Sequence, residues 1–150
     1  MYRRILVPVD GSAASLKGLD EALKLAKSLE AKVKLVHVVN ELIFDSGYMP
    51  ALDYGTVIAS LREAGKKVLA AAEAVARERG ASVEAELIEQ VGGHAADVIV
   101  RVAKQWSADL IVMGTHGRRG LRRLALGSDA ELVLRSSTVP VLLVRSAPEA

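Results

Sequence analysis

Short apolar runs rich in β-branched residues alternate along this chain with segments whose apolar residues recur at helical spacing. Because several of the runs are continuously apolar, we expect them to be strands buried on both faces, as in a parallel sheet. The predicted strands span residues 3–9, 32–39, 83–88, 109–113 and 139–144, and the predicted helices span residues 16–29, 56–79, 95–106 and 128–135. The alternation predicts a doubly wound α/β fold in which helices cover both faces of a mostly parallel sheet.

The composition limits the classes of protein to which this chain can belong. Its 150 residues suit one domain, residues 1–150, with a core of its own. The near balance of 20 basic and 18 acidic side chains argues against nucleic acid as a partner, and an aromatic content of 3% argues against base stacking. The absence of cysteine excludes disulfides and cysteine-ligated metals. No apolar run has the length of a membrane span or a signal-peptide core, so we expect a cytoplasmic protein without a membrane partner.

One loop carries the strongest functional signal. Gly114, Gly117, Gly127 and Ser128 follow the apolar run 110–113 and lead into a predicted helix. Glycines let backbone N–H groups approach an anion without obstruction by a Cβ atom, and a helix N-terminus adds a partial positive charge. In a doubly wound fold such a loop lies at the carboxyl end of a strand, where ligands bind. The segment is therefore predicted to bind phosphate.

Other common signals for phosphate binding, catalysis and metal binding are absent from the sequence. No glycine is followed by Lys-Ser or Lys-Thr in the frame of a P-loop, and the turn after the first predicted strand lacks the Gly-x-Gly-x-x-Gly dinucleotide fingerprint. The three histidines lack metal-site spacing, and no catalytic triad or carboxylate pair is evident, so we expect no catalytic residue and no metal ligand in the protein itself. A local basic excess lies within the glycine loop, and one or two of its four arginines are expected to face phosphate. These are Arg118, Arg119, Arg122 and Arg123.

The glycine loop and both ends of the chain together resemble the universal stress protein family. The pattern Gly-x2-Gly-x9-Gly-Ser is accompanied by matching segments at residues 5–12, 35–38, 108–113 and 139–144. The resemblance covers nearly the whole chain and implies a five-stranded parallel sheet in the order 3-2-1-4-5. It also implies a homodimer and membership of the ATP-binding branch of the family, whose members are expected to act as nucleotide-dependent sensors or adaptors in stress response.

The resemblance further implies where ATP would lie. In this sequence Pro8, Val9 and Val38 would flank the adenine, Asp10 would lie near the nucleoside, Met113 would lie beneath the base or ribose, and Gly114, Gly117, Gly127 and Ser128 would hold the phosphates. Mg²⁺ would bind chiefly through phosphate oxygens.

Each of these residues also has an interpretation that needs no ligand. Val9, Val38 and Met113, taken singly, suit an apolar core. Asp10 suits a turn or a helix cap, and Ser128 suits the cap of a Ser-x-x-Glu capping box. Two alternatives to nucleotide sensing therefore stay open at this point: a slow ATP hydrolase, and a ligand-free dimeric interaction module in which the glycine loop is structural.

Asp129 departs from the small apolar residue that commonly follows Gly-Ser in this family. In the first turn of a helix its carboxylate complements the helix dipole, but it would also repel a polyphosphate at the same helix end. We therefore expect weaker ATP binding, or a greater dependence on Mg²⁺, than a small apolar residue at this position would give.

The last predicted strand indicates how two subunits would pair. Pro140 lies early in this strand, a position that is tolerated mainly at the edge of a sheet. A bare apolar edge would leave a row of unpaired backbone groups. Pairing with the same strand of a second subunit, through Val139, Val141 and Leu143, is therefore expected to form the homodimer.

Overall fold

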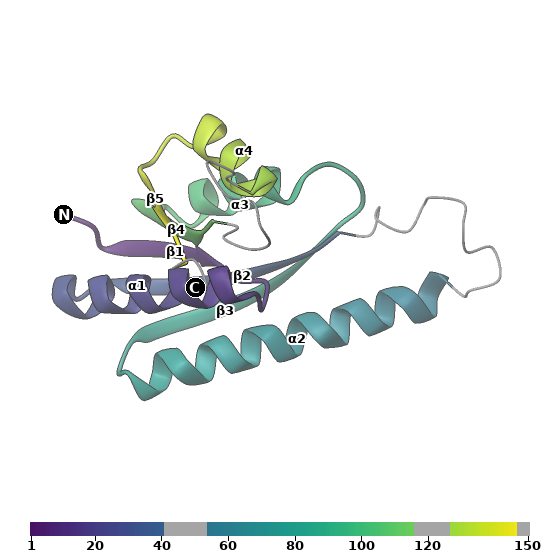
Figure 1. Ribbon diagram of the computed structural model, residues 1–150, viewed down its shortest axis with the longest axis horizontal. Helices are drawn as coiled ribbons and strands as arrows, with labels where there is room; N and C mark the ends of the chain where they lie inside the picture. Colours follow the sequence, from purple (N-terminus) through teal and green to yellow (C-terminus); the bar gives the residue numbers. More distant parts are fainter. Residues whose placement is uncertain (41–53, 116–126, 147–150) are drawn as a thin grey trace.

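The computed structural model describes residues 1–40, 54–115 and 127–146, which form strands and helices in alternation (Figure 1). In chain order the elements are β1 (Arg4–Pro8), α1 (Ala13–Leu29), β2 (Lys32–Asn40), α2 (Tyr54–Glu78), β3 (Ser82–Gln90), α3 (Ala95–Gln105), β4 (Leu110–Gly114), α4 (Ser128–Ser136) and β5 (Val141–Val144). The predicted alternation is confirmed, with boundaries that agree with the prediction to within three residues.

The strands form one parallel sheet in the order β3-β2-β1-β4-β5. The central strand β1 pairs with β2 up to the register Pro8↔Val36, and with β4 at Ile5↔Leu110. This order confirms the one that the family resemblance implied. The chain moves outward from β1 to β3 and then returns on the far side of β1 as β4. The switch point of the sheet therefore lies between β1 and β4.

Two apolar cores lie on the two faces of the sheet. Helices α1 and α2 cover one face, and α3 and α4 cover the other (Figure 1). Ile5 and Val7 of β1 project into the first core, and Leu6 between them projects into the second. All three side chains are fully buried, because successive side chains of a strand point to opposite faces. None of the helices in the described ranges combines the length and apolar character that a bilayer crossing requires.

The two helices that follow β1 and β4 begin in different ways. The N-cap of α1 is Ser12, whose hydroxyl oxygen accepts a hydrogen bond from Ser15 N at 3.1 Å. The N-cap of α4 is Gly127, so that the predicted capping box at Ser128 is wrong. Ser128 is already helical, and Glu131 lies four residues after the cap instead of the three that the box requires. The Glu131 carboxylate pairs with an arginine one turn further along the helix.

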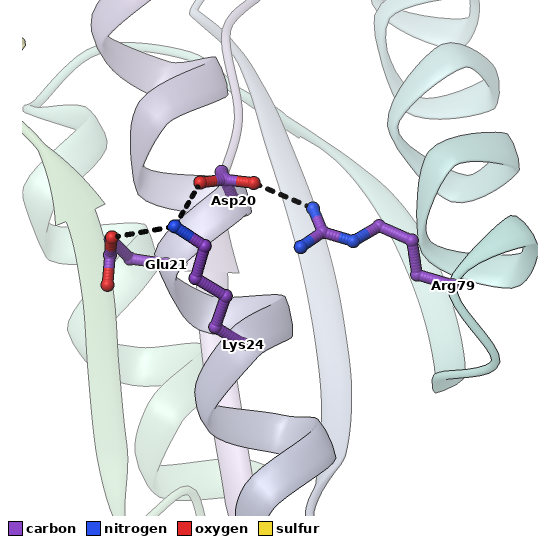
Figure 2. A network of polar contacts seen from close by, with 4 residues as sticks. All are labelled: Asp20, Glu21, Lys24 and Arg79. Carbon is purple, nitrogen blue, oxygen red and sulfur yellow. Dashed lines mark hydrogen bonds and ion pairs between the residues drawn. The ribbon is translucent and has the colours of Figure 1, made fainter.

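A polar cluster connects α1 with the end of α2 (Figure 2). The Asp20 carboxylate lies 3.0 Å from Lys24 Nζ and 2.8 Å from an Arg79 guanidinium nitrogen, and Glu21 lies 3.4 Å from the same Lys24 Nζ. Hydrogen bonds from Arg79 and then Lys24 hold the pKa of the Asp20 carboxyl below its ordinary value of 3.8.

The N-terminal end of β1 is fixed by the residue that precedes β4. The Asp109 carboxylate accepts hydrogen bonds from Arg3 N at 2.9 Å and from Arg4 N at 3.0 Å. The Arg4 side chain donates from Nε to the Trp106 carbonyl at 2.8 Å, and its guanidinium lies 4.3 Å from the centre of the indole ring. These contacts hold the start of the central strand against the end of α3.

Candidate functional site

A cleft opens at the carboxyl ends of β1 and β4, where the strand order reverses. Its described lining comes from the ends of β1, β2 and β4 and from the N-terminal parts of α1, α3 and α4, and its cavity volume is about 150 Å³. A second recess of about 520 Å³ adjoins this inner cleft, since His37, Val38, Ala95 and Asp129 line both. Ligands of doubly wound α/β proteins bind at this position.

The fold brings together most of the site residues that the family resemblance implied. Those that line the inner cleft are Pro8, Val9, Asp10, Val38, Met113, Gly114 and Gly127. Ser128 lines the adjoining recess, and Gly117 lies outside the described residues. The contacts of these residues with a ligand stay predictions.

The inner wall of the cleft is apolar and buried. Val36, Ile99 and Met113 are at most 6% exposed, and each also belongs to the core under α3 and α4. Val9, on the other side, belongs to the core under α1 and α2. Of the residues predicted to contact the nucleoside, Val9 and Met113 are thus core residues that also line the cleft, whereas Val38 is partly buried and Pro8 belongs to neither core. Apolar walls with few polar groups are typical of small-molecule sites.

Asp10 has a structural role in the turn from β1 into α1. Its backbone N–H donates to Ser15 Oγ at 3.0 Å, and its Oδ1 accepts from Ser12 N at 2.8 Å. The interpretation of Asp10 as a turn residue is confirmed, although the cap of α1 is Ser12. Asp10 also lines the cleft, so the turn fixes the position of this acidic residue at the cleft wall.

His37 of β2 holds the end of β1. Its Nδ1 lies 2.8 Å from the Val9 carbonyl oxygen, which makes Nδ1 the protonated ring nitrogen because a carbonyl only accepts. A Cβ atom at Gly65 of α2 would lie 2.7 Å from the ring, so that glycine gives the imidazole its space. Sequence reasoning assigned His37 no functional role. No local motif signals the contact, because its partners are far apart along the chain.

This contact changes the backbone edge that β2 presents to the cleft. Val9 N donates to the Val36 carbonyl at 2.8 Å, so the polar groups of Val36 point toward β1. Backbone polar groups alternate in direction along a strand, so the N–H and C=O of Val38 point to the same side of β2 as those of Val36. Val38 lies beyond Pro8↔Val36, the last pair of the register between β1 and β2. In a continued parallel ladder Val38 N would donate to the Val9 carbonyl, but the hydrogen bonds of the described backbone do not include this one, and the oxygen contacts the His37 ring instead. Val38 thus presents a backbone donor and acceptor toward the cleft.

The N-terminus of α4 faces the cleft without a side-chain cap. Gly127, Asp129 and Ala130 line the inner cleft, and no described side chain caps this helix. The first helical hydrogen bond runs from Glu131 N to the Gly127 carbonyl at 3.0 Å. The N–H groups of residues 128–130 therefore precede the hydrogen-bonded part of the helix and can donate to an acceptor in the cleft. The helix dipole adds partial positive charge at the same place.

Gly114 is explained by packing without any ligand. A Cβ atom at this position would overlap the backbone carbonyl of Ala14 in α1. From the helix side, a Cβ atom at Gly18 would lie 2.8 Å from Gly114 N. Close approach of α1 to β4 therefore requires both glycines. Contact of Gly114 with phosphate stays a prediction.

The described lining of the cleft carries negative charge. Asp10 and Asp129 line the inner cleft, and no lysine or arginine of the described residues does so. The arginines of the glycine loop lie within 116–126, outside the described residues. In the described ranges, no group of three or more histidine, aspartate or glutamate side chains is placed to hold a metal ion.

The sheet order and the cleft at its switch point define a doubly wound α/β protein with a ligand cleft at the carboxyl edge of the sheet. The model of the universal stress protein family matches residues 1–145. The chain therefore belongs to the universal stress protein family, as the sequence resemblance indicated.

Individual relatives agree with this assignment. A universal stress protein of Methanocaldococcus jannaschii is 38% identical over 146 residues, which cover 97% of this chain and 83% of the relative. The crystal structure of a universal stress family protein from Burkholderia pseudomallei is similar with a TM-score of 0.79 and 35% identity, over 97% of each chain.

Two similar structures contain an adenine nucleotide. The universal stress protein of Archaeoglobus fulgidus in complex with dAMP has a TM-score of 0.64 and 26% identity, over 95% of this chain and 98% of that one. A universal stress protein in complex with cAMP has a TM-score of 0.67 and 27% identity, over 97% of this chain and 98% of that one.

Proposed function

We propose that residues 1–150 form one adenine-nucleotide-binding domain of the ATP-binding branch of the family, acting in the cytoplasm as a nucleotide-dependent sensor or adaptor in stress response. The observation that carries the proposal is the uncapped N-terminus of α4 facing an apolar cleft at the switch point of the sheet. A nucleotide needs an apolar space for its base and backbone donors for its phosphates, and this position offers both.

The adenine would lie against the apolar wall and the edge of β2. Pro8, Val9 and Met113 would contact the faces of the ring, and Asp10 would lie near the ribose. The backbone N–H and C=O of Val38 point toward the cleft and match the neighbouring acceptor and donor on the pairing edge of adenine. The ligands named for the two nucleotide-bound neighbours, dAMP and cAMP, share this base.

The phosphates would lie at the N-terminus of α4. The N–H groups of residues 128–130 supply donors, and the absence of a side-chain cap at Gly127 leaves the helix end open to an anion. Gly114, Gly117 and the Ser128 hydroxyl would complete the phosphate contacts. Mg²⁺ would bind chiefly through the phosphate oxygens.

Isothermal titration with AMP and with ATP in the presence of MgCl₂ tests the proposal. Ala95, the first residue of α3, lines both the inner cleft and the adjoining recess. Ala95→Leu would therefore fill the space that the ligand needs. We expect the variant to weaken binding by at least about tenfold, since a clash in a packed site excludes the ligand. Ala70→Leu adds the same group to an exposed position of α2 and should bind as the wild type does.

The same preparation separates the two alternatives. Release of phosphate or adenylate from bound ATP would establish the slow hydrolase. A protein that neither retains an adenine nucleotide through purification nor binds one in titration would contradict the nucleotide proposal and favour the ligand-free interaction module.

Homodimer formation through β5 is a further part of the proposal. β5 is an edge strand that begins directly after Pro140, and Val139, Val141 and Leu143 are partly buried against the core under α3 and α4. The outer backbone edge of this strand would pair with its copy. Sedimentation equilibrium should give twice the mass of the chain, and a lysine at Leu142, which is 38% exposed, should shift the equilibrium toward monomer.

A further inference from the structure

The charge of the described cleft wall bears on which nucleotide it accepts. Asp10 lies on the β1 side of the inner cleft and Asp129 lies on the α4 side. No described lysine or arginine lines the cleft beside them. A polyphosphate at the N-terminus of α4 would therefore lie beside the Asp129 carboxylate as well as beside the backbone donors of that helix end.

Asp129 is placed to have the larger effect on the phosphates. It lies in the first turn of α4 and lines both the inner cleft and the adjoining recess. Its side chain is exposed, and no described residue forms a hydrogen bond or ion pair with it. By contrast, the Asp10 carboxylate already accepts a hydrogen bond from Ser12 N on the turn into α1.

We propose that Asp129 makes polyphosphate binding at this cleft depend strongly on a divalent cation, while a nucleoside monophosphate binds with little dependence on the cation. This inference rests on the proposed function. Each additional phosphate brings further negative charge toward the Asp129 carboxylate. A divalent cation on the phosphate oxygens cancels much of that charge and also attracts the carboxylate. AMP has a single phosphate and experiences less of the repulsion.

The inference is tested by dissociation constants for ATP and AMP, each measured in MgCl₂ and in EDTA. For each nucleotide, the ratio of the constant in EDTA to the constant in MgCl₂ measures the dependence on the cation. The wild-type protein should bind ATP at least about tenfold more weakly in EDTA. The reason is that salt only partly screens the repulsion between the Asp129 carboxylate and the nearby phosphates. For AMP, the ratio of the two constants should lie near one. Asp129→Asn should reduce the ATP ratio by about three- to tenfold, mainly by strengthening binding in EDTA.

Glu131→Gln is the matched control. Glu131 lies on the same helix, two residues further on, but it pairs with Arg135 and does not line the cleft. This variant should keep the wild-type ratio for ATP. Circular dichroism should show that both variants retain the wild-type fold, since both side chains are exposed.

The outcomes separate this inference from the proposed function. If AMP and ATP bind but Asp129→Asn leaves the ATP ratio of the wild type unchanged, the inference is wrong and the proposed function stands. An AMP ratio as large as the ATP ratio would equally overturn it. If neither nucleotide binds the wild-type protein in either buffer, the proposed function and the inference fail together.

Discussion

The imidazole of His37 lies with its Nδ1 2.8 Å from the carbonyl oxygen of Val9, at the point where β1 leaves the sheet. This side-chain hydrogen bond replaces the backbone bond that Val38 N would donate in a continued ladder. The central strand therefore ends without an unpaired buried carbonyl. The backbone N–H and C=O of Val38 on β2 are then available to a ligand in the cleft. One side chain thus connects the stability of the sheet with the geometry of the candidate site.

Replacement of His37 should reduce the stability of the fold. His37→Leu would leave the carbonyl of Val9, a residue only 5% exposed, without its partner, and should reduce the free energy of unfolding by about 1–3 kcal/mol. His37→Asn places an amide N–H near the former Nδ1 and should recover part of the loss. Urea denaturation measures both values. Equal losses in the two variants would show that the hydrogen bond is not the source of the effect.

Gly114→Ala should be strongly destabilising. The added Cβ would overlap the Ala14 backbone, and no rotamer change relieves an overlap between backbone and Cβ. We expect a loss of at least about 3 kcal/mol, at the upper end of overpacking effects. Gly55→Ala, at an exposed position in the first turn of α2, is the control and should be neutral or stabilising by up to about 1 kcal/mol. Similar thermal midpoints for Gly114→Ala and the wild type would contradict the described packing of α1 on β4.

The Asp20 cluster should make a small pH-dependent contribution to stability. The pKa of Asp20 is lower in the folded protein than its ordinary value of 3.8, so the contribution is present above that value and is lost as the pH falls through the folded pKa. Because the carboxylate is 39% exposed, we expect Asp20→Asn to cost only about 0.5–1 kcal/mol at neutral pH. Urea denaturation across pH should show the wild type and variant converging in acid. A difference that persists unchanged at low pH would exclude the ion pairs as its source.

Arg79→Gln and Asp20→Asn together form a double-mutant cycle that tests this prediction. It removes the hydrogen bond that contributes most to the shift of the Asp20 pKa, so its effect and that of Asp20→Asn should not add in the double variant. Raised salt should reduce both single effects, because exposed charges are screened.

Asp109→Ala should loosen the start of the central strand. The substitution removes the acceptor for the N–H groups of Arg3 and Arg4. Amide hydrogen exchange of these two residues should accelerate by about tenfold or more, whereas exchange of Val7, deeper in the same strand, should change only with global stability. Unchanged protection at Arg4 would show that this carboxylate does not hold the strand end.

Much of the fold was predictable because its signals are local. The apolar run 110–113 and the helical spacing in residues 95–106 each report burial within one element, and the family resemblance implied the strand order. The start of α4 was predicted with the wrong cap because a capping box is read from residue types alone. Whether Gly127 or Ser128 adopts the extended conformation of the N-cap depends on the tertiary context and not on residue type alone.

The site was predictable only in part. Asp10 and Met113 were identified through the family pattern, and the fold brings them to one cleft. The contacts of His37 with Val9 and of Asp109 with the start of β1 join segments far apart in the sequence, and neither has a motif. The packing requirement at Gly114 has the same long-range origin, so a glycine that the sequence associates with phosphate also has a structural cause.

Amide chemical-shift mapping during titration of the ¹⁵N-labelled protein with AMP and MgCl₂ tests the central claim most directly. We predict progressive shifts of the backbone N–H signals of Val38 at the edge of β2 and of Asp129 and Ala130 at the N-terminus of α4. The amides around Asp20, on the outer side of α1, should serve as unshifted references. Saturable binding that leaves the Val38 and Ala130 signals in place, or no shift at any amide, would contradict the account.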